Sequence, residues 1–146
     1  MAAGKLNTLL QLAVVVILIT LLCGFSSVWS QQYLKVHVYV NNNLYPGTDM
    51  WVHCKSEDED LGAHKVAYDM DFAWTSHIKI DWDTTKFVCH IWWWDSKGQM
   101  VDGFFDIYKS TRDIYDCTYE CHRFVKPDGI YFLVNDTIKF TNPWPE

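Results

Sequence analysis

Apolar and polar residues alternate in several short runs of this chain, and residues that favour turns separate the runs. In the clearest run, residues 35–40, Val36, Val38 and Val40 recur at every second position. A two-residue period places alternate side chains on opposite faces of a strand. Turn signals repeated about every eight to twelve residues are typical of an antiparallel sandwich or barrel. We therefore predict an all-β fold, a small antiparallel β-sandwich stapled by two disulfides, with no convincing helix in it.

The strand predictions follow the same pattern along the chain. The run at 86–94 is the strongest, because it is rich in β-branched and aromatic residues. We expect a short edge strand at 63–66 and a last hairpin that brings Ile138 and Phe140 back onto 130–134. The remaining predicted strands are residues 35–40, 50–56, 71–74, 77–80, 101–108 and 123–125.

The first 30 residues have the pattern of a secretory signal peptide. Lys5 supplies a short positive region, residues 9–23 are nearly all apolar, and small residues precede a cleavage site after Ser30. We expect the mature chain to begin at Gln31, with Ser26/Ser27 as the alternative. A membrane anchor is the competing interpretation. The apolar run is near the short end for crossing about 30 Å of hydrocarbon, and no basic cluster follows it.

Residues 31–146 then form a single domain, which we expect to be secreted into the extracellular space without stable membrane insertion. The loss of Lys5 leaves eleven Lys and Arg side chains against eighteen Asp and Glu, a net charge of −7. An acidic chain repels phosphate backbones, so we expect no nucleic-acid partner. A basic surface on another protein is compatible with this charge. We also predict a monomer without a cofactor.

Four of the five cysteines lie after the leader: Cys54, Cys89, Cys117 and Cys121. An even number in a secreted chain predicts two disulfides, and four cysteines allow three pairings. We favour Cys54–Cys121 and Cys89–Cys117, since Cys117 and Cys121 are out of reach in an extended chain, although a helical turn could join them. A zinc site with nearby histidines is disfavoured, because the chain has no Cys-x-x-Cys pair.

Three consecutive tryptophans, Trp92 to Trp94, lie on the strongest predicted strand. They cannot all face inward, so Trp93 and the Trp92/Trp94 pair must lie on opposite faces. An exposed tryptophan is typical of a sugar-binding platform or of a hot spot for protein binding. The alternative is that a neighbouring loop covers it.

The sequence gives weaker signals for a metal site and for catalysis, and it contains one acceptor for glycosylation. Residues 57–60 are four consecutive carboxylates that could attract Ca²⁺, but the EF-hand spacing is absent, and we expect a solvated turn and no metal site. No arrangement of nucleophile, base and orienting group is visible, and we predict no catalytic residues and no enzyme activity. Asn135 begins an Asn-Asp-Thr acceptor for N-glycosylation in a predicted turn.

Several motifs occur in an order that resembles the plant self-incompatibility protein family, the S-protein homologues. They span nearly the whole predicted mature chain, at residues 52–56 (VHCKS), 60–62 (DLG), 72–74 (FAW), 84–89 (TTKFVC), 105–108 (FDIY), 121–125 and 128–131 (DGIY). One position departs from the family pattern: Arg123 stands where a tryptophan is usual. We expect this change to cause local repacking or greater exposure.

The resemblance implies a small secreted β-sandwich without known enzymatic activity. Founding members of the family act in the pistil as ligands of a pollen receptor, so we predict a ligand that binds a cell-surface protein. Contacts are expected on loops 41–49, 95–102 and 109–116, with Lys97, Arg112, Asp113 and Trp93 as candidate partner-binding residues. The alternative function is that of a secreted carbohydrate-binding or defence protein that uses the Trp92–Trp94 surface.

Overall fold

The computed structural model describes residues 2–24, 32–80 and 83–146, in two compact units. The first unit, Met1–Gln31, holds helix α1 (Ala2–Gly24), and the described side chains of this helix, residues 5–21, are exposed. No helix in these described ranges has both the length and the hydropathy required to span a membrane. The predicted cleavage site at Ser30 and the start at Gln31 lie outside the described residues, as does the alternative at Ser26/Ser27.

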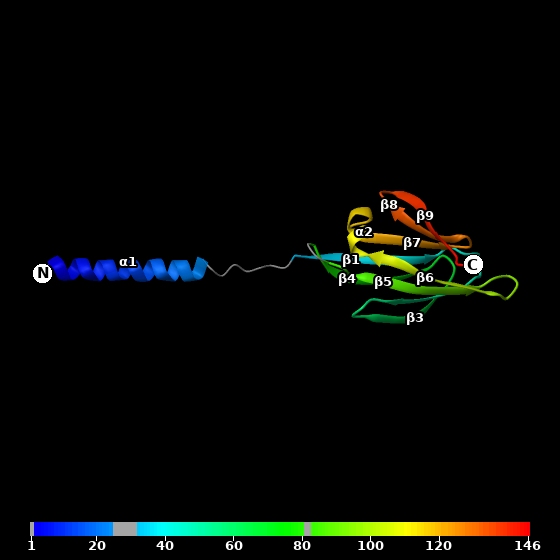
Figure 1. Ribbon diagram of the computed structural model, residues 1–146, viewed down its shortest axis with the longest axis horizontal. Helices are drawn as coiled ribbons and strands as arrows, with labels where there is room; N and C mark the ends of the chain where they lie inside the picture. Colours follow the sequence, from blue (N-terminus) through cyan, green and yellow to red (C-terminus); the bar gives the residue numbers. More distant parts are fainter. Residues whose placement is uncertain (1, 25–31, 81–82) are drawn as a thin grey trace. The chain divides into compact units, whose positions relative to one another are not determined.

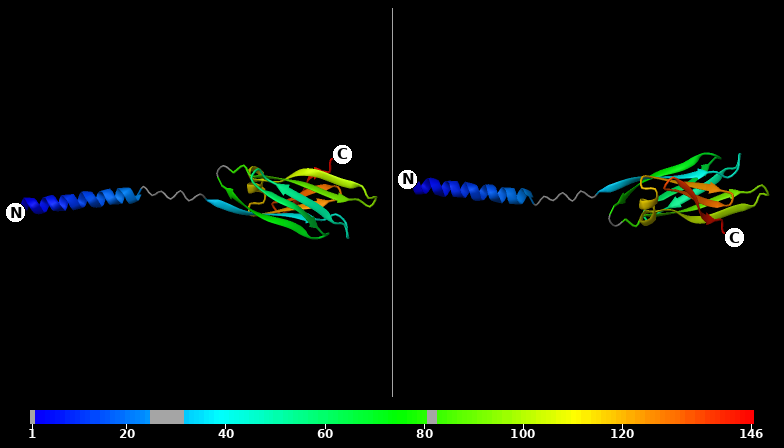
Figure 2. Two further views of the ribbon diagram at one scale, coloured as in Figure 1. Left: turned by 90° about the horizontal axis from the view of Figure 1, so that it is seen from below. Right: turned by 90° about the horizontal axis from the view of Figure 1, so that it is seen from above.

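Two β-sheets make up the second unit, Gln32–Glu146 (Figure 1). The five-stranded sheet has the order β4-β1-β7-β8-β9, with bounds Asp71–Lys79, Tyr33–Asn42, Glu120–Lys126, Gly129–Val134 and Thr137–Pro143. The four-stranded sheet has the order β3-β2-β5-β6, with bounds Asp60–Val66, Met50–Lys55, Lys86–Trp94 and Met100–Lys109. Figure 2 shows both sheets from two opposite sides. The predicted all-β sandwich is confirmed.

The alternation in β1 places Val36, Val38 and Val40 in the core, each with no exposed surface. They belong to one buried apolar cluster with Val52 and Ile91 of the other sheet. All neighbouring strands are antiparallel except β1 and β7, which pair in parallel. A parallel pair needs a long crossover, and here the chain between the two strands builds the whole four-stranded sheet. The core therefore joins the two sheets, whereas every residue of the edge strand β9 is exposed.

Two disulfides form, but the predicted pairing is wrong. The bonds are Cys54–Cys89 and Cys117–Cys121. Cys54 and Cys89 are direct cross-strand partners on β2 and β5, with Cα atoms 4.0 Å apart. A tight turn after a helix brings the Cα atoms of Cys117 and Cys121 to 5.1 Å. Strand register and this turn decide the pairing, and neither is encoded in cysteine spacing.

A second correction concerns residues 110–116, which we expected to be a polar connection. They form the short helix α2 (Ser110–Asp116) between β6 and β7. The Asp113 carboxylate accepts a hydrogen bond of 2.8 Å from the backbone N–H of Lys109, which precedes the helix. The Asp113 carbonyl accepts the N–H of Cys117 at the other end of the helix. One buried residue thus supports both ends of this helix, which is too short to be stable by itself in water.

Candidate functional site

Three connections meet at one end of the sandwich and enclose an open pocket. They are the β1–β2 connection, the β5–β6 turn and the β7–β8 turn, and we call this region the pocket end. Helix α2 lies at the opposite end of β6, which we call the helix end (Figure 1). The pocket has a volume of about 680 Å³ and is lined by Tyr45, Thr48, Trp93, Trp94, Asp95, Ser96, Val101 and Pro127.

Internal hydrogen bonds hold the loops of the pocket end in shape. The side chain of Asn42 is fully buried and donates to the carbonyls of Thr48 and Val66, at 2.9 and 2.8 Å. Its Oδ1 atom accepts the N–H of Leu44. On the β5–β6 turn, Oδ1 of Asp95 accepts the backbone N–H groups of Lys97 and Gln99, both at 2.8 Å. The β1–β2 connection and the β5–β6 turn are therefore each built around one polar side chain.

Aromatic side chains give the pocket its surface. Trp93 points into the core and is 4% exposed, whereas Trp94 is 49% and Tyr45 is 52% exposed. The rings of Tyr45 and Trp93 lie 6.2 Å apart and are tilted by 59°. The indole N–H of Trp93 is buried and has no hydrogen-bond partner in the described structure. The predicted split of the tryptophan run is confirmed, with Trp93 inside and Trp92 and Trp94 outside.

The predicted contact loops do not form one surface. Residues 41–49 and 95–102 meet at the pocket end, where Lys97 is exposed on the β5–β6 turn. Residues 109–116 lie at the helix end, and Asp113 is only 1% exposed there. We expected residues 109–116 to be a contact loop, but most of them form helix α2, and Asp113 packs into the fold. Trp93 is also mostly covered, so it lies beneath the pocket surface.

Asp113 belongs to a buried charged cluster with Arg112 and Arg123. Arg123 is fully buried, and its Nη2 atom lies 3.0 Å from Oδ1 of Asp113. Its Nε–H donates to the carbonyl of Ile107 at 2.8 Å. Arg112 donates to both carboxylate oxygens of Asp113, each at 2.8 Å. The departure from the family pattern at Arg123 is therefore accommodated by repacking around a paired charge, and greater exposure did not occur.

Phe132 completes the environment of this charged cluster. The guanidinium of Arg123 lies 3.8 Å from the centre of the Phe132 ring, and that of Arg112 lies 4.8 Å from it. Burial lowers the pKa of Arg123 to about 10, although the Asp113 charge opposes the change. Burial also acts to lower the pKa of Arg112, but the hydrogen bonds to Asp113 and the nearby carboxylate charges of Asp113, Asp106 and Asp116 together outweigh this effect and raise it. Both arginines remain charged at neutral pH, so the cluster anchors α2 and β7 to the sandwich.

The outer face of the four-stranded sheet carries a second aromatic group, the aromatic stack, formed by Trp51, Trp92, His90 and Phe104. The His90 ring lies 4.4 Å from Phe104 and 4.7 Å from Trp92, at angles of 11° and 26°. Trp51 and Trp92 are 5.9 Å apart and within 8° of parallel. Nε2 of His90 lies 2.8 Å from the Asp102 carboxylate. Several ring faces are therefore covered by neighbouring rings, while Phe104 stays 70% exposed.

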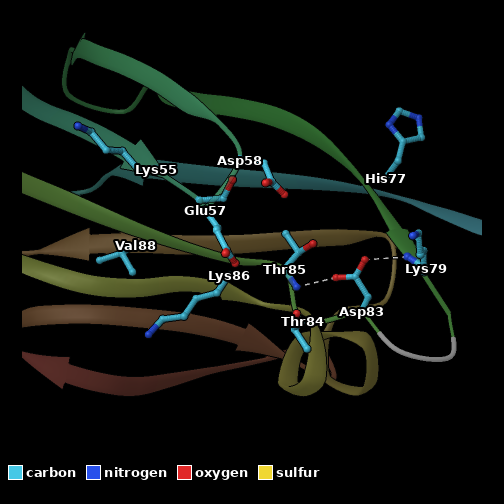
Figure 3. Close-up of a pocket in the computed structure, with 11 residues that line it drawn as sticks. Lys55, Glu57, Asp58, His77, Lys79, Asp83, Thr84, Thr85, Lys86 and Val88 are labelled. Carbon is cyan, nitrogen blue, oxygen red and sulfur yellow. Dashed lines mark hydrogen bonds between the residues drawn. The ribbon is translucent and has the colours of Figure 1, made fainter.

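An open groove of about 880 Å³ lies beside the β2–β3 turn at the helix end (Figure 3). Glu57 and Asp58 of the acidic run line it together with Lys55, Lys79 and Lys86. Side chains of both signs share this surface, which favours no particular charged ligand. The acidic run itself is exposed, as expected for a turn. Nowhere in the described ranges are three or more His, Cys, Asp or Glu side chains placed to hold a metal ion.

Asn135 is exposed on the β8–β9 turn, next to α2 at the helix end. Its backbone and that of Asp136 have φ values of 48° and 60°, which asparagine and aspartate tolerate better than most residues. The backbone N–H of Asn135 also bonds to the carbonyl of Asp116. The acceptor sequence therefore sits on a tight, accessible turn.

The sequence analysis did not identify Tyr45 as a candidate partner-binding residue. It considered Trp94 only as part of the Trp92–Trp94 surface proposed to bind sugars. The available signal was an aromatic residue at the start of a Tyr-Pro-Gly-Thr turn, where the core cannot cover it. It also missed Trp51, His90 and Phe104. Their grouping depends on the register of three strands, which no local pattern reveals.

Fold and surface together define a small, disulfide-bonded β-sandwich with loop-built surfaces at its two ends. Residues 37–144 match the model of the plant self-incompatibility protein S1 family. The chain belongs to this family, as its sequence motifs indicate.

Curated relatives from Arabidopsis thaliana support this membership. S-protein homolog 24 is 40% identical over 88 residues, which are 60% of this chain and 55% of that protein. S-protein homolog 18 is 32% identical over 95 residues, 64% of this chain and 66% of that protein. S-protein homolog 29 is 32% identical over 114 residues, 77% of this chain and 78% of that protein. The chain thus spans between about half and two thirds of the first two relatives.

A solved structure has the same fold. It belongs to the SPH (self-incompatibility protein homologue) proteins, described as a widespread family of small, highly stable, secreted proteins from plants. The match has a TM-score of 0.50 at 16% identity and covers 80% of this chain and 96% of the other. At this identity, the likeness supports the sandwich architecture.

Proposed function

We propose that this protein is a secreted recognition ligand that binds a cell-surface protein through its pocket end. In this proposal residues 1–30 are a signal peptide removed after Ser30, and residues 31–146 act outside the cell as a monomer. Family membership supports a role in recognition between cells. The protein acts by surface complementarity, without catalysis and without a cofactor.

The observation that carries the proposal is the pair of exposed rings at the pocket end. Tyr45, on the β1–β2 connection, and Trp94, at the end of β5, are each about half exposed, and hydrogen bonds of Asn42 and Asp95 hold the adjoining loops. Large aromatic side chains held on rigid loops are typical hot spots of protein interfaces, because little side-chain freedom is lost on binding. Lys97 projects from the same end, so the pocket end combines apolar anchors with a charge at the rim.

The helix end is less suited to contact a partner. Its charged residues Asp113 and Arg123 are buried in pairs, and Arg112 is directed to Asp113. A glycan on Asn135, which we include in the proposal, would cover part of this end. The acidic predicted mature chain further favours a partner whose contact surface is basic.

Binding of purified variants to plant cell surfaces tests the proposal. We expect Tyr45→Ala to weaken binding to pollen tubes or root protoplasts by at least about tenfold, as for an interface hot spot. Tyr115 on α2 is 81% exposed and provides a matched control at the helix end. We expect Tyr115→Ala to bind normally, with both variants melting like the parent protein. Equal loss from both variants, or loss from Tyr115→Ala alone, would contradict the assignment.

Carbohydrate binding through the Trp92–Trp94 surface is the second candidate function. The exposed Phe104 ring favours it, because sugars stack on open aromatic faces. The aromatic stack weakens it, because His90 and Trp92 already stack on each other. Binding to cell-wall oligosaccharides that Phe104→Ala abolishes and Tyr45→Ala leaves unchanged would favour this function instead.

A further inference from the structure

At the pocket end, several hydrogen-bond acceptors are already engaged within the protein, whereas one buried donor is not. The carbonyl of Tyr45 accepts the N–H of Thr48, and the carbonyl of Thr48 accepts the side chain of Asn42. The carbonyl and one carboxylate oxygen of Asp95 also accept hydrogen bonds within their own turn. These acceptors around the pocket are therefore engaged before any ligand arrives.

The hydrogen-bond donor of Trp93, by contrast, is not engaged. The indole N–H of Trp93 is buried and has no acceptor in the described structure, although buried polar groups are nearly always paired. Trp93 lines the pocket together with Tyr45, whose half-exposed ring lies 6.2 Å from the Trp93 ring. The hydroxyl groups of Thr48 and Ser96 line the same pocket and can also donate. The pocket thus offers aromatic faces and one buried, unpaired donor, while the second carboxylate oxygen of Asp95 and the two hydroxyl groups can also accept.

A ligand that fits this pocket has apolar surface for the rings and a hydrogen-bond acceptor for the N–H of Trp93. Proline meets these conditions, because its ring is apolar while the backbone carbonyl remains a strong acceptor. An extended proline-rich segment projects rings and carbonyls in the polyproline II conformation, and aromatic-lined grooves recognise such segments.

We propose that the pocket formed by Tyr45, Trp93, Trp94 and Pro127 binds an extended, proline-rich segment of the protein partner. The rings of Tyr45 and Trp94 hold the prolines, and a backbone carbonyl of the segment accepts the N–H of Trp93 once Tyr45 turns aside. The acidic chain favours basic residues that flank the prolines. This inference rests on the proposed function and specifies the chemical class of its ligand.

The direct test is a titration of the purified, oxidised protein with a peptide of about ten prolines that carries lysine at both ends. Two-dimensional NMR of the indole N–H groups is the readout, and Trp93→Phe assigns the signal of Trp93. We expect the Trp93 signal to move on titration. We also expect Tyr45→Ala and Trp94→Ala to weaken binding by at least about tenfold.

Two controls make the result specific. Phe104→Ala removes a more exposed ring outside the pocket, and it should change affinity by less than about twofold. A peptide with alanine in place of every proline should bind at least about tenfold more weakly. No binding of the proline peptide at about 5 mM would overturn the inference. Equal weakening by Phe104→Ala, or a Trp93 signal that moves only with a cell-wall oligosaccharide, would also overturn it.

The two proposals fail in different ways. If the peptide does not bind but Tyr45→Ala still abolishes attachment to cell surfaces, the ligand class is wrong and the recognition function stands. If the peptide binds at the pocket while Tyr45→Ala leaves cell attachment unchanged, the pocket exists but cell recognition uses another surface.

Discussion

The two ends of the sandwich use polar residues for opposite purposes. At the pocket end, Asn42 and Asp95 organise loops and leave the rings of Tyr45 and Trp94 facing solvent. At the helix end, the charges of Asp113 and Arg123 turn inward and hold α2 to the sheet. A polar, turn-rich composition therefore does not show that a segment contacts a partner. Its polar side chains can instead be buried and bonded within the fold.

The largest effect that separates the two ends should come from Asp113→Leu. This change leaves Arg123 as a buried charge whose main partner is gone, which typically costs about 3–5 kcal/mol of unfolding free energy. Urea unfolding followed by tryptophan fluorescence measures the loss. The double variant Asp113→Leu/Arg123→Met should recover much of the stability, since the fully buried charge of Arg123 is then removed and only the partly exposed Arg112 has lost its partner. A single variant as stable as the parent protein would show that the cluster does not anchor the helix end.

The two disulfides should differ in the stability that they contribute. Cys54–Cys89 spans 35 residues and Cys117–Cys121 spans 4, so chain-entropy estimates give about 4 and about 2 kcal/mol. Paired Cys→Ala variants, compared by urea unfolding, test this order. We expect the Cys117/Cys121 variant to fold and to lose protection from hydrogen exchange mainly in α2. Loss of protection at the pocket end in that variant would contradict the separation of the two ends.

In acid, we expect a pH effect on stability at the helix end, where Asp83 lies. Burial acts to raise the pKa of Asp83, but hydrogen bonds from Thr85 and Lys79 outweigh it and hold the pKa below its usual value of 3.8. A carboxyl whose pKa is lower in the folded state stabilises the fold above the unfolded value. This contribution is lost as the pH falls through the folded pKa.

We therefore expect Asp83→Asn to lose less stability than the parent protein between about pH 5 and about pH 2. Urea midpoints measured across this range provide the test. Asp58→Asn is the control, because Asp58 is an exposed carboxylate for which the described structure shows no hydrogen bond or ion pair. Identical acid sensitivity in Asp83→Asn and the parent would refute the role of Asp83.

The smallest effects should come from exposed charges at both ends. Lys97→Ala on the β5–β6 turn and Glu57→Gln in the acidic run should each change stability by no more than about 0.5 kcal/mol. Of the two, Lys97→Ala alone should weaken attachment to cell surfaces. Calorimetric titration should also detect no micromolar binding of Ca²⁺ at the acidic run. A saturable isotherm that Asp58→Asn removes would change this interpretation.

Local patterns in the sequence predicted the architecture because a strand with one buried face needs a two-residue period. The buried valines of β1 and the separation of Trp93 from Trp92 and Trp94 onto opposite faces follow from that period alone. The even number of cysteines likewise predicted two disulfides. Each of these inferences needs only neighbours in the chain, and the physical constraint on each acts locally.

Tertiary structure alone decided which distant residues meet. Cys54 pairs with Cys89 because β2 and β5 align in that register, and a shift by one residue would place the two side chains on opposite faces. Helix α2 forms because Asp113 finds Arg123, a partner on another element. The pocket arises where separate turns converge around Tyr45. Register, charge pairing and convergence are properties of the packed chain, so no local sequence pattern could specify them.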